Sequence, residues 1–82
     1  MQPDDPDRIA AARDAAQQLG YMLSVDEARN VPAPITHMAL AAHHSRTGVA
    51  HFLAFSTSTA DAAEAGLQVL RDVLEGRREW PE

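Results

Sequence analysis

The side chains best suited to catalysis or metal binding are the four histidines, because cysteine is absent. They are His37, His43, His44 and His51. In the hairpin predicted below, His44 and His51 are diagonal neighbours on one face, where two imidazoles could share a metal ion. Two ligands do not complete a site, and a third would have to come from a distant carboxylate such as Asp26 or Glu27. We therefore expect no metal and no cofactor, and a small histidine-dependent hydrolase or nuclease is the alternative to a noncatalytic role.

Length and charge narrow the possible functions. The 82 residues predict a single small domain, with residues 1–5 and 77–82 as flexible tails. A net charge of −5 has the wrong sign for a protein that mainly neutralises phosphates. The acidic N-terminus does not resemble a signal peptide, and no apolar run approaches the ~20 residues of a membrane span, so we expect a cytoplasmic protein. Two Phe, one Tyr and one Trp provide a thin core, which favours a homo-oligomer.

Residues 58–75 carry the pattern of an amphipathic helix. One predicted side is apolar and contains Ala62, Ala63, Gly66, Leu67, Val69, Leu70, Val73 and Leu74. Ser58 suits the N-cap, and Gly76 suits the left-handed residue that ends a helix. Gly66 lies inside the apolar side, so we expect the helix backbone to approach the sheet closely there.

The remaining elements are a first helix over residues 6–19 and three strands. The predicted strands cover residues 21–25, 35–44 and 48–56. Residues 26–34 are predicted to form a loop, since Pro32 and Pro34 cannot donate ladder hydrogen bonds. Residues 35–44 alternate as a strand does, but their Met, Ala and Leu content also suits a helix. We favour a strand there, because residues 45–48 resemble a hairpin loop before the next strand.

These elements predict an α+β fold of order α-β-β-β-α, with two helices on one face of a three-stranded antiparallel sheet. The predicted register places Leu40 opposite Leu53 and Met38 opposite Phe55, with both pairs beneath the helices. The other face of the sheet would then expose Ala39, Ala41, Phe52 and Ala54.

A Pro and a His, Pro34 and His37, precede the second predicted strand, and the last helix opens with a Ser and is rich in Ala. The matching helix residues are Ser58, Ala62, Ala65 and Leu70. With the order of elements, these features resemble the double-stranded RNA-binding domain over residues 7–75. Where that family has phosphate-gripping lysines, this chain has Thr59, Ala60 and Asp61. The resemblance therefore implies the fold, and a protein-interaction or dimerisation role like that of degenerate members, rather than RNA binding.

The sequence thus predicts a noncatalytic interaction or regulatory module, homodimeric through the exposed sheet face. The same face would be closed if Trp80 or the proline-containing loop covers it. An acidic helix side would suit a basic protein partner, as in an inhibitor or antitoxin; its residues are Asp61, Glu64, Asp72 and Glu75. Trp80 completes the predicted interaction residues, although packing within its own chain is the simpler interpretation. A degenerate nucleic-acid-binding domain is the third hypothesis.

Overall fold

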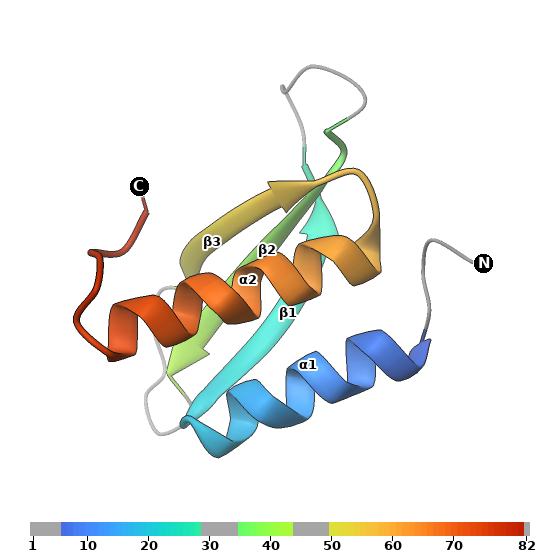
Figure 1. The fold of residues 1–82 in the computed structure, drawn as a ribbon. Coiled ribbons are helices and arrows are strands. Elements are labelled where there is room, and N and C mark those ends of the chain that lie inside the picture. Colours follow the sequence, from blue (N-terminus) through green and yellow to red (C-terminus); the bar gives the residue numbers. More distant parts are fainter. Residues whose placement is uncertain (1–5, 29–34, 44–49, 82) are drawn as a thin grey trace.

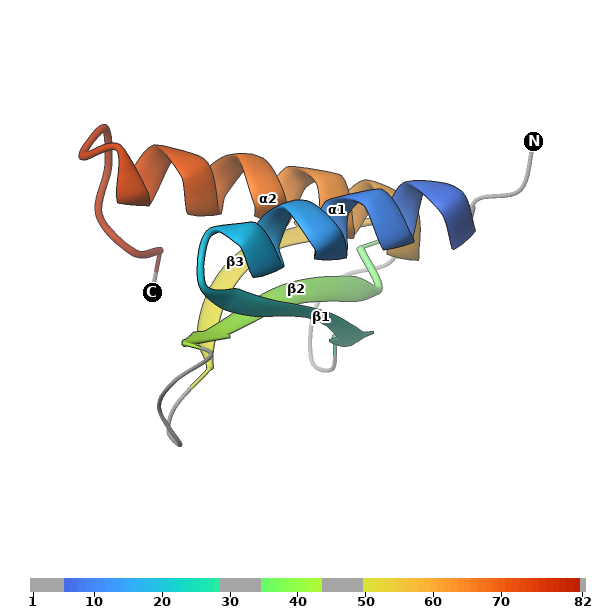
Figure 2. The ribbon, with the colours of Figure 1, turned by 90° about the horizontal axis from the view of Figure 1, so that it is seen from below.

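The computed structural model describes residues 6–28, 35–43 and 50–81, which form two layers (Figure 1). Helices α1 (Pro6–Gln18) and α2 (Thr59–Leu74) form one layer. Strands β1 (Tyr21–Glu27), β2 (His37–His43) and β3 (His51–Ser56) form an antiparallel sheet in chain order. Both helices lie on the same face of the sheet (Figure 2), so the predicted α+β fold is confirmed, including the strand within residues 35–44. None of the described helices is long and apolar enough to cross a membrane.

The ends of α2 follow the predicted capping chemistry. The Ser58 hydroxyl accepts a hydrogen bond from the Asp61 backbone N–H at 3.2 Å, which satisfies one of the orphan amides of the first turn. Gly76 has a φ of +78°, a conformation that glycine adopts without a Cβ clash, and it follows the last turn of the helix. Both predicted helix signals are confirmed.

Small residues form most of the core between the helices and the sheet. Its buried members are Ala12, Ala16, Leu23, Ala39, Ala41, Leu53, Ala62, Ala63 and Leu70. Gly66 shows how close the layers are, because a Cβ placed there would lie 2.5 Å from the Ala39 Cβ. The predicted close approach of α2 to the sheet is therefore confirmed, and it requires small side chains on both layers.

The pairing of β2 with β3 corrects the predicted register. Met38 lies opposite Phe55 as predicted, but Leu40 lies opposite Phe52 rather than Leu53. The register shifts between Ala39 and Leu40, as in a β-bulge, so one residue of β3 has no direct partner. That residue is Leu53, which packs into the core beside Gly66.

Strand β1 is longer than predicted. Asp26 and Glu27, which the sequence pattern places in the loop, pair with Met38 and His37 in β2. The backbone N–H of Ala28 also donates to the Thr36 carbonyl at 2.8 Å, which holds the start of the connection. Ladder pairing along the whole length of β2 therefore overrides the low strand propensity of the acidic residues. Pro32, Pro34 and the predicted hairpin loop over residues 45–48 lie outside the described residues.

Candidate interaction surface

One face of the sheet has no described helix over it (Figure 2). Apolar side chains of all three strands line this face. Alternation along the strands places three pairs of facing residues on this side of the sheet. The pairs are Met22 with Ala42, Met38 with Phe55, and Leu40 with Phe52. We call this apolar set the outer face; its residues are Met22, Met38, Leu40, Ala42, Phe52 and Phe55. Met22 is 58% exposed and Phe55 is 44% exposed, while the other four are half-buried. The exposed Ser24 and Asp26 of β1 lie on the same side of the sheet.

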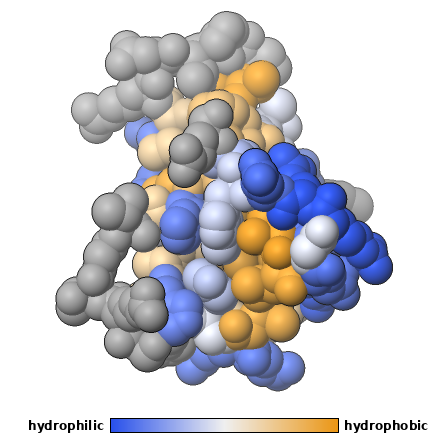
Figure 3. All heavy atoms as spheres, turned by 90° about the vertical axis from the view of Figure 1, so that its left-hand side faces the viewer, coloured by the Kyte–Doolittle hydropathy of each residue, from blue (hydrophilic) through white to orange (hydrophobic). Residues whose placement is uncertain are grey.

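Aromatic side chains give the outer face its centre on β3. The rings of Phe52 and Phe55 lie 4.7 Å apart between centroids, tilted by 50°. Apolar atoms also reach the surface on the side of the molecule that contains the β3 edge, between hydrophilic areas (Figure 3). Antiparallel sheets with one free face normally place polar side chains there, so this apolar face needs an explanation.

The residues predicted to form the interaction surface are therefore partly misplaced. Ala39 and Ala41 are fully buried beneath the helices, and Ala54 pairs with Ala39 on that inner side. The prediction placed Met38 and Leu40 inside and Ala39 and Ala41 outside, whereas the close approach of α2 at Gly66 leaves room only for a small residue at Ala39 of β2. Phe52 does lie on the outer face.

Five outer-face residues were missed from the predicted surface, namely Met22, Met38, Leu40, Ala42 and Phe55. A signal for them was present in the sequence. Gly66 and the alanine-rich sides of both predicted helices indicate that the helix and sheet backbones lie close together. Small strand residues must then face the helices, and the larger ones must lie on the other face of the sheet.

Two of the four acids on the predicted acidic side of α2 are ion-paired with Arg8 of α1. The Arg8 guanidinium of α1 contacts the Asp61 carboxylate at 2.7 Å and binds Glu64 through both of its carboxylate oxygens. The hydrogen bonds from Arg8 lower the pKa of Asp61 and of Glu64, and the hydrogen bond from Ser58 further lowers that of Asp61. The same bonds to Glu64 and Asp61 raise the pKa of Arg8.

The other two acids lie at the end of α2. Arg77 approaches Glu75 at 3.3 Å and Asp72 at 3.9 Å, and the Gln68 amide donates to the Asp72 carboxylate at 3.0 Å. All four acids thus have a cationic partner in their own chain, so each offers less charge to a basic partner protein. Binding of such a partner stays a prediction.

The C-terminal segment brings Trp80 back to the core. Its indole stacks on the His51 imidazole, with centroids 4.0 Å apart and planes 11° apart, and it lies 5.8 Å from the Tyr21 ring. Tyr21 in turn meets His43 edge-on at 5.1 Å. Trp80 therefore packs within its own chain and away from the outer face, as the simpler interpretation predicted.

The described histidines contact neighbouring side chains within the chain. His51 is stacked on Trp80, and His37 shares a hydrogen bond of 2.8 Å with the neighbouring Thr36 hydroxyl. His44, the predicted partner of His51, lies outside the described residues. Within the ranges that the structure describes, no three His, Cys, Asp or Glu residues are grouped so that they could hold a metal ion.

Comparisons with protein-family models, with curated proteins and with solved structures found no match. The order of one helix, three antiparallel strands and one helix is nevertheless the layout that the sequence resemblance implied.

Proposed function

We propose that this protein is a noncatalytic interaction module that forms a homodimer through the outer face of its sheet. The observation that carries the proposal is the set of large apolar side chains on a face without a described helix, with Met22 and Phe55 the most exposed. Burying such a side chain contributes about 1.5–3 kcal/mol, which is substantial beside the small core of this chain.

A second copy suits this face because the face carries little charge. Among the described strand residues that point to this side, Asp26 at one end of β1 is the single charged one. The acids of α2 lie on the opposite layer and are paired there with Arg8 and Arg77. Two copies with a net charge of −5 each can therefore meet through their sheets with most of their charges far from the contact.

The expected geometry is a two-fold symmetric pair of stacked sheets. Antiparallel sheets that pack face to face lie about 10 Å apart, and their side chains interdigitate. Phe52 and Phe55 would enter the partner's face beside the small Ala42, and the same contact would be repeated by symmetry. The layout shared with the double-stranded RNA-binding domain, whose degenerate members act as dimerisation modules, agrees with this role.

Sedimentation velocity across a concentration series tests the proposal. The wild-type chain should shift from monomer to dimer as the concentration rises, and Phe55→Asp should stay monomeric, because dimerisation would bury its carboxylate without a partner. Thr57→Asp adds the same charge at an exposed position beside the N-cap of α2 and should dimerise as the wild type does.

Two results would contradict the proposal. The first is a wild-type chain that remains monomeric throughout the series. The second is a dimer that Phe55→Asp and Phe52→Asp leave intact while circular dichroism shows both variants to be folded, since the contact would then lie elsewhere.

A further inference from the structure

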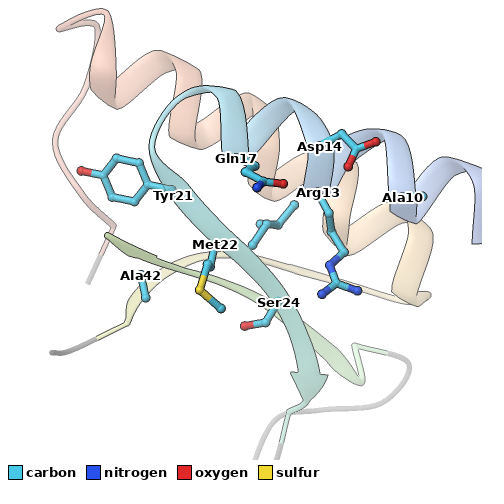
Figure 4. A pocket seen from close by; sticks show the side chains of 9 residues that line it. Ala10, Arg13, Asp14, Gln17, Tyr21, Met22, Ser24 and Ala42 are labelled. Carbon is cyan, nitrogen blue, oxygen red and sulfur yellow. The ribbon is translucent and has the colours of Figure 1, made fainter. Parts of the chain in front are cut away.

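A second surface lies between α1 and β1, at the edge of the sheet opposite to β3. A groove of about 480 Å³ runs there, with Arg13 and Gln17 above it on α1 and residues of β1 along its floor (Figure 4). Its lining includes Leu23, which points beneath the helices, and Met22 with Ala42, which belong to the outer face. The groove therefore follows the edge of β1 from one side of the sheet to the other.

Strand β1 is an edge strand with one free side. It pairs with β2, and within the described residues no strand lies on its other side. An antiparallel edge strand directs alternate backbone N–H and C=O groups outward, and these groups form a template for another extended chain. The groove thus offers hydrogen-bonding groups of the backbone as well as apolar contacts.

Arg13 supplies a charge above this edge. Its side chain extends from α1 toward Ser24 of β1, whereas the neighbouring Asp14 stays at the level of the helix (Figure 4). No carboxylate of the described chain pairs with Arg13, in contrast to Arg8 five residues earlier, which holds Asp61 and Glu64. The guanidinium is therefore available to a carboxylate that enters the groove.

We propose that this groove binds an extended peptide segment of a partner protein, which adds to β1 as a fourth strand and places one carboxylate beside Arg13. Backbone pairing along an edge with alternating side-chain contacts is a recognised mode of peptide binding. Side chains on one side of the added strand would lie beneath α1. The carboxylate that meets Arg13 is one of these side chains, and the others must be small or apolar. Those on the other side extend the outer face beyond Met22.

A partner's peptide fits this edge better than a second copy of the chain. Two copies paired through β1 would bring both α1 helices to the same edge, because α1 runs alongside β1 (Figure 1). A single extended segment brings no helix. The proposal does not require dimerisation through the outer face, because its hydrogen bonds use the backbone edge of β1, although Met22 and Ala42 border both surfaces.

The test is a titration of the ¹⁵N-labelled full chain with a synthetic peptide, acetyl-Thr-Val-Thr-Asp-Thr-Val-Thr-amide, followed by NMR. The Val and Asp side chains of this probe alternate with Thr, so they share one side of a strand. Saturable shifts are expected at the amides of Met22, Leu23 and Ser24. A peptide with Lys in place of Asp should bind about three- to tenfold more weakly.

Variants of the chain sharpen the test. Arg13→Glu should reverse the preference, so that the Lys peptide binds more tightly than the Asp peptide. Arg78→Glu makes the same charge change at an exposed tail position and should leave the preference unchanged. A peptide with Pro in place of both Val residues cannot donate the ladder hydrogen bonds at those positions and should lose binding.

Several outcomes would overturn the proposal. They are an absence of shifts, shifts confined to Phe52 and Phe55, equal binding of the Pro peptide, and an Arg13→Glu variant that keeps the preference for Asp. If Arg13→Glu does not fold, the comparison of Asp and Lys peptides on the wild-type chain decides the charge preference. If the probe instead releases monomers from a dimer paired through β1, a second copy is the occupant and the proposal is wrong.

Discussion

The two faces of the central strand β2 differ in the size of their side chains. Ala39 and Ala41 of β2 face the helices, and Met38, Leu40 and Ala42 of the same strand face the other way. The inner face is closed by backbones that approach closely, as Gly66 shows, whereas the outer face carries Phe and Met without a described helix over it. Both phenylalanines of the chain thus lie outside the core, on the face that we propose a second copy buries.

The largest effect is expected from removing Leu70, a large side chain of α2 that is fully buried in the core. Leu70→Ala should lower the free energy of unfolding by about 2–5 kcal/mol, because it opens a cavity among small residues that cannot fill it. Leu74→Ala is the matched control, since Leu74 lies on the same helix but is 43% exposed, and its loss should be below about 1 kcal/mol. Urea unfolding of both variants measures the difference, and equal losses would contradict the core described above.

A second pair of variants compares the faces directly within β2. Ala39→Leu should destabilise the chain by about 1–3 kcal/mol, since the added atoms meet the backbone of α2 at Gly66. Ala42→Leu makes the same change on the outer face and should alter the stability of the monomer, measured at low protein concentration, by no more than about 0.5 kcal/mol. Unfolding by denaturant provides the measurement. A larger loss of stability in Ala42→Leu than in Ala39→Leu would mean that Ala42, and not Ala39, faces the helices.

A third variant concerns the end of the core against which Trp80 packs. His51→Ala removes the ring on which the indole stacks and should cost about 0.5–1.5 kcal/mol. Because Trp80 is the single tryptophan, its fluorescence should shift to longer wavelength as the ring becomes wetter. His37→Ala, at the other end of the sheet, should leave the emission unchanged; an unchanged emission in His51→Ala would mean that the stack does not hold the indole.

The smallest effect concerns the ion pairs that join α1 to α2. The folded-state pKa values of Asp61 and Glu64 are lowered, so these groups stabilise the fold above their ordinary values of 3.8 and 4.5. That contribution is lost as the pH falls through the lowered folded-state values, because protonation then ends the pairing. Arg8→Gln should flatten the acid limb of a plot of stability against pH.

Arg13→Gln provides the control for this pH dependence, since Arg13 lies on the same helix and pairs with no described carboxylate. Thermal unfolding between pH 7 and acid pH gives both curves. An acid limb that Arg8→Gln leaves as steep as that of the wild type would show that the pairs add nothing in solution.

The order and type of the elements could be predicted from the sequence, because local signals specify them. Ser58 and Gly76 mark the ends of α2, and strand alternation marks β2 and β3. The assignment of the two sheet faces could not be obtained from alternation, which separates two sets of residues without saying which one meets the helices. The β-bulge that turns Leu53 inward and the ion pairs of Arg8 depend on contacts between distant segments, so no local pattern revealed them.

If two copies meet through the outer face, as we propose, the side chains of that face become buried. The direct measurement is the relaxation that a soluble paramagnetic probe causes in the methyl groups of Met22 and Met38, recorded as the protein concentration rises. We predict that this relaxation decreases for both methyls, while that of the exposed Leu74 methyls on α2 stays constant. Constant relaxation at Met22 and Met38 across the whole concentration range would contradict this proposal.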